Sequence, residues 1–384
     1  MHFIAPRKTF IGTGSVENLA QVVKGYDAKR VYLVTDKEIV KAKLVASVSE
    51  VLAGAEADVS LFDGTEPEPT LSSVDAASDA MRRARDVDLI VSLGGGSVMD
   101  VAKCANVVFM NGGSILEFED GADDSRTILR LLPHVAIPTT AGTGSEATVW
   151  AVFIDPKRRF KTAVQSPDLM PNVAILDPMM TVTMPPRVSA GTGMDALTHA
   201  IEAFVSSYAT PLTESLCAKA IELVAQNLRT AVKAGEVLEA RTNMLIASYM
   251  AGMAFSNSTL GIVHTLAEAM GGYYRIPHGV TNSLMLPYVM EFNASAALAK
   301  FARIAELMGE DTTGLSTERA AELSWHAVRK LSRDTGLPQA LRDVGFRKDD
   351  LEGLVAIADK WANVSGNPKE ISRDEIEMLY LRAY

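Results

Sequence analysis

The stretch GTGMDALTHAIEAF, at 191–204, places a carboxylate and an imidazole four residues apart among apolar residues. On a helix, Asp195 and His199 would lie one turn apart on the same face. Leu197 and Phe204, among other apolar neighbours, indicate that this helix is largely buried. A bound metal ion would give a buried acid and imidazole a common partner, so the pair is a candidate for half of a metal site.

Two further histidines lie in segments of similar character, His264 in GIVHTLAEAMGGYY and His278 in RIPHGVTN. Taken singly, each is more simply explained as a core histidine with satisfied hydrogen bonds. Together with the first pair they provide one carboxylate and three imidazoles, which suit Fe(II), Zn(II) or a similar divalent ion. Spacing alone does not establish this set, because the two later histidines are far along the chain. Glu268 follows His264 by one turn, but HxxxE is not the HExxH of zinc proteases.

A glycine-rich turn, SLGGGSVMDVAK at 92–103, follows a predicted strand and begins a predicted helix. Gly95 and Gly96 allow close approach of the backbone to a ligand, and the amides of Ser97 and Val98 would lie at a helix N-terminus that favours pyrophosphate. The pattern is not GxGxxG, and a simple tight turn explains it as well.

A second loop, IPTTAGTGSE at 137–146, also follows a predicted strand and carries the hydroxyls of Thr139, Thr140, Thr143 and Ser145. Loops at the carboxyl ends of parallel strands face one crevice, where open α/β sheets bind ligands. The two loops together therefore favour a dinucleotide site over a simple turn.

Asp36 ends the strand-like segment VYLVTDK. A carboxylate there can accept hydrogen bonds from ribose hydroxyls and would repel a 2′-phosphate, which favours NAD over NADP. The alternative is a helix N-cap for the residues that follow.

The first half of the chain alternates strand-like and helix-like segments. Helices are predicted at 70–85 and 98–110, between short runs rich in Val, Ile and Leu at 30–36, 57–63, 88–96, 134–140 and 172–177. This alternation predicts an α/β fold with a parallel sheet covered on both faces. From Pro185 onward the periodicity is helical, and SRDE at 372–375 indicates a capping box before a final helix. We therefore expect a dinucleotide-binding α/β domain at 1–183 and an all-α metal-binding domain at 184–384.

The bulk composition excludes several classes of protein. A net charge of −10 over 384 residues makes nucleic acid an improbable general partner. No apolar run reaches the length of a membrane span, and the N-terminus lacks the apolar core of a signal peptide. The two cysteines, Cys104 and Cys217, have no neighbouring thiol and are expected to be free and buried. We expect a cytoplasmic protein.

The motifs GGGSVMD, PTTAGTGSE, GMDALTHAIE, MAFSNSTLGIVHTLAEAMGGYY and PHGVTNSLMLPYVMEFN occur in this order, and GNPKEIS follows near the C-terminus. In this the chain resembles the iron-dependent (group III) alcohol dehydrogenases over essentially its whole length, and it is most similar to their lactaldehyde reductase (propanediol oxidoreductase) branch.

The resemblance implies a cofactor-binding α/β domain, a helical domain, a bound metal and a homodimer. It implies that the metal ligands are Asp195, His199, His264 and His278. Side chains that would line the substrate pocket are Trp150 and Phe255. The positions where the family contacts the nicotinamide cofactor are Asp36, Gly95, Gly96, Ser97, Asp100, Thr139, Thr140, Thr143, Val152 and Lys161. For Asp100, a helix-start acid favoured by the helix dipole is the alternative.

The chain departs from that branch at two positions. Members often have a histidine one turn after the third ligand, where this chain has Glu268, so proton relay or substrate contact there falls to a carboxylate. Trp150 is bulkier than expected for a small-diol enzyme.

The resemblance implies hydride transfer between NAD(H) and a small primary alcohol or its aldehyde, aided by Fe(II), with Zn(II) as the alternative metal. The physiological substrate and direction remain open. Alternatives on the same architecture are a glycerol dehydrogenase-like enzyme and a dehydroquinate synthase-like lyase. A maleylacetate reductase is disfavoured because those relatives often lack the full set of four metal ligands. A non-catalytic NAD-binding protein is disfavoured because both the cofactor loop and the metal ligands would then be present without a function.

Overall fold

A computed structural model describes residues 3–158, 160–274, 276–360 and 364–384 of the chain. The chain divides into two compact units, which are described separately. One, here called the α/β unit, contains Ile4–Thr140 and Gly144–Thr183, and the other, the helical unit, consists chiefly of Ala141–Thr143 and Met184–Tyr384.

The α/β unit alternates strands and helices along most of its length. Its strands are β1 (Lys8–Ile11), β2 (Arg30–Val34), β3 (Asp58–Phe62), β4 (Leu89–Gly94), β5 (His134–Pro138), β6 (Trp150–Asp155), β7 (Phe160–Gln165) and β8 (Val173–Leu176). Its α-helices are α1 (Leu19–Gly25), α2 (Lys37–Lys41), α3 (Leu44–Gly54), α4 (Leu71–Ala84) and α5 (Gly96–Asn111). Short 3-10 helices are η1 (Ser15–Asn18), η2 (Ile115–Phe118), η3 (Ser145–Ala147), η4 (Pro167–Leu169) and η5 (Pro178–Thr181).

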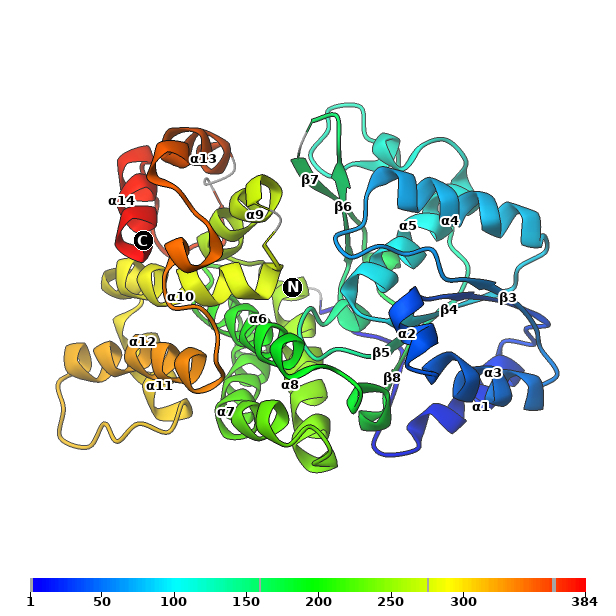
Figure 1. The fold of residues 1–384 in the computed structure, drawn as a ribbon, viewed down its shortest axis with the longest axis horizontal. Coiled ribbons are helices and arrows are strands. Elements are labelled where there is room, and N and C mark those ends of the chain that lie inside the picture. The colour runs from blue at the N-terminus through cyan, green and yellow to red at the C-terminus, as the bar shows by residue number, and fades with distance from the viewer. Residues whose placement is uncertain (1–2, 159, 275, 361–363) are drawn as a thin grey trace. The chain divides into compact units, whose positions relative to one another are not determined.

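Six strands of the described residues form one sheet in the order β1-β8-β5-β4-β2-β3, and every neighbouring pair is parallel. Side chains alternate between its faces, so that Val31 and Leu33 pack with α1 and α3 while Tyr32 and Val34 pack with α4 and α5. Figure 1 shows these helix pairs on opposite sides of the sheet. The predicted α/β fold with a parallel sheet is confirmed.

Two strand features were not predicted from the sequence. The edge strand β1 pairs with β8, far along the chain, and β6 with β7 forms a separate antiparallel hairpin. Ala151 and Phe153 of β6 pack against Cys104 and Val108 of α5, so the hairpin covers a face of that helix. Both cysteines of the chain are buried and free, as expected.

The helical unit consists of α-helices, with short 3-10 helices in some of the connections between them. Its α-helices are α6 (Pro186–Val205), α7 (Pro211–Lys233), α8 (Leu238–Ser258), α9 (Ile262–Tyr274), α10 (His278–Asn293), α11 (Leu298–Leu307), α12 (Thr317–Asp334), α13 (Leu351–Asp359) and α14 (Arg373–Ala383). Short 3-10 helices are η6 (Ala294–Ala296), η7 (Leu341–Val344) and η8 (Lys348–Asp350). The predicted helical C-terminal region is confirmed, and Ser372 with Glu375 forms the predicted capping box of α14.

Helix α6 occupies the interior of this unit. It packs against α7, α8 and α10, and nearly every residue from Ser189 to Val205 is buried. Gly193 allows this close contact, because a Cβ there would meet Leu228 at 2.2 Å. A helix buried on all sides has no solvent-facing stripe, so any polar residue on it needs a protein or ligand partner.

Candidate functional site

Helix α6 presents Asp195, His199 and Glu202 inside the helical unit, and all three side chains are buried. Their spacing of four and three residues puts them on one face of the helix. Oδ2 of Asp195 lies 4.0 Å from Nδ1 of His199. The predicted helix and the predicted proximity of Asp195 and His199 are therefore present in the structure.

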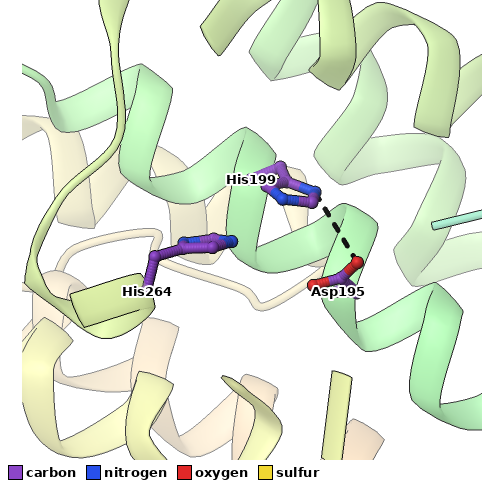
Figure 2. Close-up of side chains that lie close together, drawn as sticks. All are labelled: Asp195, His199 and His264. Carbon is purple, nitrogen blue, oxygen red and sulfur yellow. Dashed lines mark ion pairs between the residues drawn. The ribbon is translucent and has the colours of Figure 1, made fainter. Parts of the chain in front are cut away.

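His264, on α9, completes a compact group with this pair, as Figure 2 shows. One ligand atom each of Asp195, His199 and His264 lies within 4.8 Å of the others. The rings of His199 and His264 stack with their centroids 4.5 Å apart. Such a separation of donor atoms suits a single ion placed between them, because metal–ligand bonds to nitrogen and oxygen are about 2.0–2.2 Å long.

His278, the first residue of α10, lies beside this group. Its Nε2 atom is 3.8 Å from Oδ1 of Asp195, and its ring centroid is 5.3 Å from that of His264. It is more exposed than the other three residues, with a side-chain exposure of 19%. The structure thus brings all four sequence-predicted ligands together, three in one tight cluster and the fourth at its edge.

A close contact between two glycines determines how near α10 comes to α6. A Cβ at Gly279 would lie 2.2 Å from the carbonyl oxygen of Gly191 and 3.2 Å from Cβ of Asp195. Gly279 directly follows His278. The glycine therefore lets α10 begin against the backbone of α6, which places His278 beside Asp195.

Glu202 belongs to the candidate site and was not predicted from the sequence. Its Oε2 atom lies 2.5 Å from Nδ1 of His264, and its Oε1 accepts a hydrogen bond from the backbone N–H of Val263 at 2.7 Å. A proton on Nδ1 leaves Nε2 with its lone pair free for a metal. Its position seven residues after Asp195 and three after His199 was the signal available in the sequence.

The imidazole of His199 is oriented by the backbone. Its Nδ1 lies 3.3 Å from the carbonyl oxygen of Gly142, and its ring stacks on Phe255 with a centroid separation of 4.7 Å. Burial lowers the pKa of His199 to about 4, although the carboxylate of Asp195 opposes this shift. Burial also acts to lower the pKa of His264, but Glu202 outweighs it and the pKa is raised.

Asn282 contacts several of these groups at once. Its Nδ2 lies 2.7 Å from Oδ1 of Asp195, 3.3 Å from Nε2 of His264 and 3.1 Å from Nε2 of His278. Among the described residues, its buried Oδ1 has no hydrogen-bond partner. Oδ1 of Asp195, Nε2 of His264 and Nε2 of His278 thus direct their lone pairs at one NH₂ group. A cation requires such a convergence of lone pairs, so the donor set fits a divalent metal.

In the α/β unit, several of the predicted cofactor residues follow three neighbouring strands, whereas Val152 and Lys161 lie in the β6–β7 hairpin. Asp36 follows β2, Gly95 follows β4 and Thr139 follows β5, all at the carboxyl edge of the sheet. The strand order reverses between β2 and β4, and this switch point is where doubly wound folds bind nucleotides. A Cβ at Gly95 would meet Oγ1 of Thr140 at 3.2 Å, so the glycine turn and the threonine loop are in contact.

Asp36 is also the N-cap of α2, since its Oδ1 accepts a hydrogen bond from the N–H of Ile39 at 2.9 Å. The capping alternative raised from the sequence is thus present in the structure. The cap uses one carboxylate oxygen, Oδ1, and does not involve Oδ2.

Asp100, on α5, accepts hydrogen bonds at both carboxylate oxygens from the protein. Oδ1 accepts from the hydroxyl of Ser145 at 2.8 Å, and Oδ2 accepts from the N–H of Val152 at 3.2 Å. Burial raises the pKa of Asp100, although Lys103 opposes the shift. Lys161 forms an ion pair with Glu68 at 3.1 Å.

The predicted pocket residues are divided between the two units. Trp150 begins β6 in the α/β unit, whereas Phe255 on α8 and Glu268 on α9 belong to the helical unit. Within the helical unit, Phe255 contacts His199 directly and Glu268 is close enough to His264 to raise its pKa. Thr143 belongs to the helical unit as well.

Comparison with known proteins gives matches over nearly the whole chain. Residues 6–178 match the family model described as iron-containing alcohol dehydrogenase, and residues 189–384 match the C-terminal model of the Fe-containing alcohol dehydrogenase family. None of the helices in the described ranges combines the length and the apolar character that a membrane span requires.

Individual relatives match end to end. The chain is 40% identical to a 1,3-propanediol dehydrogenase of Citrobacter freundii, with 100% of this chain and 98% of that protein covered. It is 37% identical to an NAD-dependent methanol dehydrogenase of Bacillus methanolicus, with 100% and 99% covered. The crystal structure of a 1,3-propanediol oxidoreductase superposes with a TM-score of 0.95 at 39% identity, over 100% of this chain and 99% of that one.

Proposed function

The chain belongs to the iron-containing alcohol dehydrogenase family and is an alcohol dehydrogenase, and on this basis we propose which reaction it catalyses and which residues serve it. The proposed reaction converts a small primary alcohol and NAD⁺ reversibly into the aldehyde, NADH and a proton. The observation that carries the proposal is the buried convergence of Asp195, His199 and His264, with His278 at its edge.

We propose that these four side chains hold one divalent metal, Fe(II) in preference to Zn(II). Three imidazoles and one carboxylate suit both ions, and the family to which the chain belongs favours iron. When bound, such an ion supplies Lewis acidity toward the substrate oxygen. Asp195 provides the one negative charge, and His199 with its lowered pKa is a neutral ligand at physiological pH.

The surrounding residues prepare the ligands and exclude water. Glu202 keeps the proton of His264 on Nδ1, and the carbonyl of Gly142 does the same for His199. Phe255 covers one face of the His199 ring with apolar surface, which favours a dry site. Glu268, one turn from His264, is the titratable group that we propose for proton relay or substrate contact, and its charge disfavours anionic substrates.

We further propose that the α/β domain, 1–183, binds NAD(H) and that the helical domain, 184–384, binds the metal. The glycine turn Gly95–Ser97 would receive the pyrophosphate at the N-terminus of α5. Asp36, with one oxygen engaged in capping α2, would accept from the ribose through the other. The remaining proposed cofactor contacts are Asp100, Thr139, Thr140, Thr143, Val152 and Lys161. We propose a homodimer as the assembly.

The test is NADH oxidation by purified protein, loaded with Fe(II) without oxygen, against a panel of small aldehydes that includes lactaldehyde and 3-hydroxypropanal. We expect turnover that a chelator removes and Fe(II) restores, and no metal-dependent turnover by His264→Ala despite retained NADH binding. Turnover by His264→Ala at the wild-type rate would remove the metal assignment. Bound metal and bound NADH without turnover of any aldehyde would favour a dehydroquinate synthase-like lyase. In the reverse assay with NAD⁺ and a panel of alcohols, glycerol as the best substrate would favour a glycerol dehydrogenase-like enzyme.

A further inference from the structure

Lys103, in the middle of α5, is one of the largest fully buried side chains in the described parts of the molecule. Its ammonium nitrogen contacts five oxygen atoms, which belong to three residues. These are the carbonyl and hydroxyl of Ser145 at 2.8 and 3.0 Å, those of Thr148 at 3.1 and 3.0 Å, and the carbonyl of Trp150 at 2.8 Å. Lysine is almost never fully buried unless its charge is compensated, so this arrangement has a structural reason.

All five oxygens come from one segment of the chain, Ser145–Trp150. The segment starts with η3 and leads into β6, and it has little regular backbone hydrogen bonding of its own between these elements. The ammonium is the short-range donor to the carbonyls of Ser145 and Trp150, since their other contacts, from the N–H and hydroxyl of Thr148, are 3.4–3.5 Å long. The segment thus folds around the positive charge of Lys103.

Asp100, one turn earlier on the same helix, binds the first residue of this segment and a residue of β6 just beyond its end. It accepts from the hydroxyl of Ser145 and from the N–H of Val152. Its negative charge also stabilises the charged form of Lys103, whose pKa burial lowers to about 8. Two side chains of α5 thus fix the path of the chain from Ser145 to Val152.

We propose that Lys103 is a positioning residue for the nicotinamide cofactor, because it holds Ser145–Val152 in the shape that cofactor binding requires. The inference depends on the proposed NAD(H) site, since Val152 is one of its contacts and Trp150 is a proposed pocket residue. Lys103 is too deeply buried to touch the cofactor. Its contribution is made through the segment that it organises.

The experiment measures the Kd for NADH by fluorescence titration, together with thermal unfolding, so neither metal nor turnover is needed. Lys103→Met removes the ammonium and keeps most of the side-chain length. We expect the Kd for NADH to rise about tenfold or more. Thr148→Val removes a single acceptor and is expected to raise the Kd about threefold, which keeps the inference testable if Lys103→Met does not fold.

Asn106→Leu is the matched control. Asn106 lies one turn after Lys103 on α5, is equally buried and also ties down a loop, but its partner is Leu132. We expect this variant to lose thermal stability with an unchanged Kd for NADH. A lowered melting temperature with wild-type NADH affinity in both Lys103→Met and Thr148→Val would overturn the inference. If instead the wild-type protein binds no NADH, the proposed function itself fails.

Discussion

Glu202 and His264 are joined by a hydrogen bond of 2.5 Å, between the carboxylate Oε2 on α6 and Nδ1 on α9. The second oxygen of Glu202 is already engaged, because it accepts from the N–H of Val263. One carboxylate thus accepts two hydrogen bonds from α9, and Nε2 of His264 is left free on the side of Asp195 and His199.

Glu202→Gln tests this arrangement. A glutamine has one acceptor oxygen, so its NH₂ group must face either the N–H of Val263 or Nδ1 of His264. In the second case the proton of His264 moves to Nε2, which can then no longer bind a metal. We expect metal affinity to fall about 10–100-fold, measured by chelator competition on stripped and reloaded protein. Glu222→Gln, on α7, should match the wild type, and equal affinities in all three proteins would contradict the role of Glu202.

Gly279→Ala tests the contact between α10 and α6. The new Cβ would meet the backbone of Gly191, which cannot move aside as a flexible side chain can. We expect α10 to shift and the free energy of unfolding to fall by about 1–3 kcal/mol. Metal affinity should fall with it, because His278 leaves Asp195.

Gly271→Ala is the control for this substitution, because its nearest neighbour would be an ordinary contact at 3.8 Å. The two variants are compared by urea unfolding in the presence of a chelator and by metal titration. Wild-type metal affinity in Gly279→Ala would show that the backbone contact does not position the ligand.

Asp36→Ser separates the two roles of Asp36. Serine retains the N-cap hydrogen bond to Ile39 and removes the negative charge. We expect the preference for NADH over NADPH to fall about tenfold, because the carboxylate that would repel the 2′-phosphate of NADPH is removed. The measurement compares the Kd values of both cofactors and the melting temperature. An unchanged preference would leave Asp36 as a helix cap alone.

The burial of His134, on β5, leads us to expect that the free energy of unfolding decreases on acidification. It is buried against Ser92, with Nε2 2.8 Å from the hydroxyl, and burial lowers its pKa to about 3. The unfolded chain has the ordinary histidine pKa of about 6.5, so on acidification it binds a proton before the folded protein does. Above pH ~6.5 His134 is neutral in both states and does not change the free energy of unfolding. Between pH ~6.5 and pH ~3 only the unfolded chain is protonated, so the free energy of unfolding falls by about 1.4 kcal/mol per pH unit of acidification.

Urea unfolding of the metal-free protein between pH 7 and 4.5 checks this expectation. His134→Gln keeps a neutral polar group near Ser92 but cannot bind a proton, so its stability should fall less steeply on acidification. His199 is also buried and contributes to the slope of both proteins, which makes the difference between them the relevant quantity. Parallel curves for the two proteins would contradict the prediction.

Much of the architecture follows from local pattern. Strands such as β4 and β5 are continuous apolar runs, and α6 shows in its sequence the spacing that puts Asp195 above His199. The strand β1 was not predicted because Lys8–Ile11 has only four residues, none of them fully buried, and its pairing with β8 depends on a distant segment. The hairpin β6–β7 was missed for a similar reason, since its burial comes from α5.

The candidate site shows the same division. The ligand residues could be proposed from their types and from the resemblance, but the residues that orient them could not all be found. Glu202 lies on the same face of α6 as Asp195 and His199, so its spacing in the sequence could have identified it. Lys103 could not be identified in this way, because a lysine in a helix is normally solvated and nothing in the sequence indicates that Ser145 and Thr148 would surround it.

Helix α6 provides two of the proposed ligands, whereas His264 and His278 each come from another helix. An ion bound to all four would close two loops of chain at once, a long one from His199 to His264 and a short one from His264 to His278, as a pair of disulfides does. Much of its stabilising effect would then come from the restricted conformational freedom of the unfolded chain, which the folded contacts do not reveal. Since each ligating atom must carry no proton, mild acid would release the ion, and the protein would lose this cross-link before its hydrophobic core unfolded.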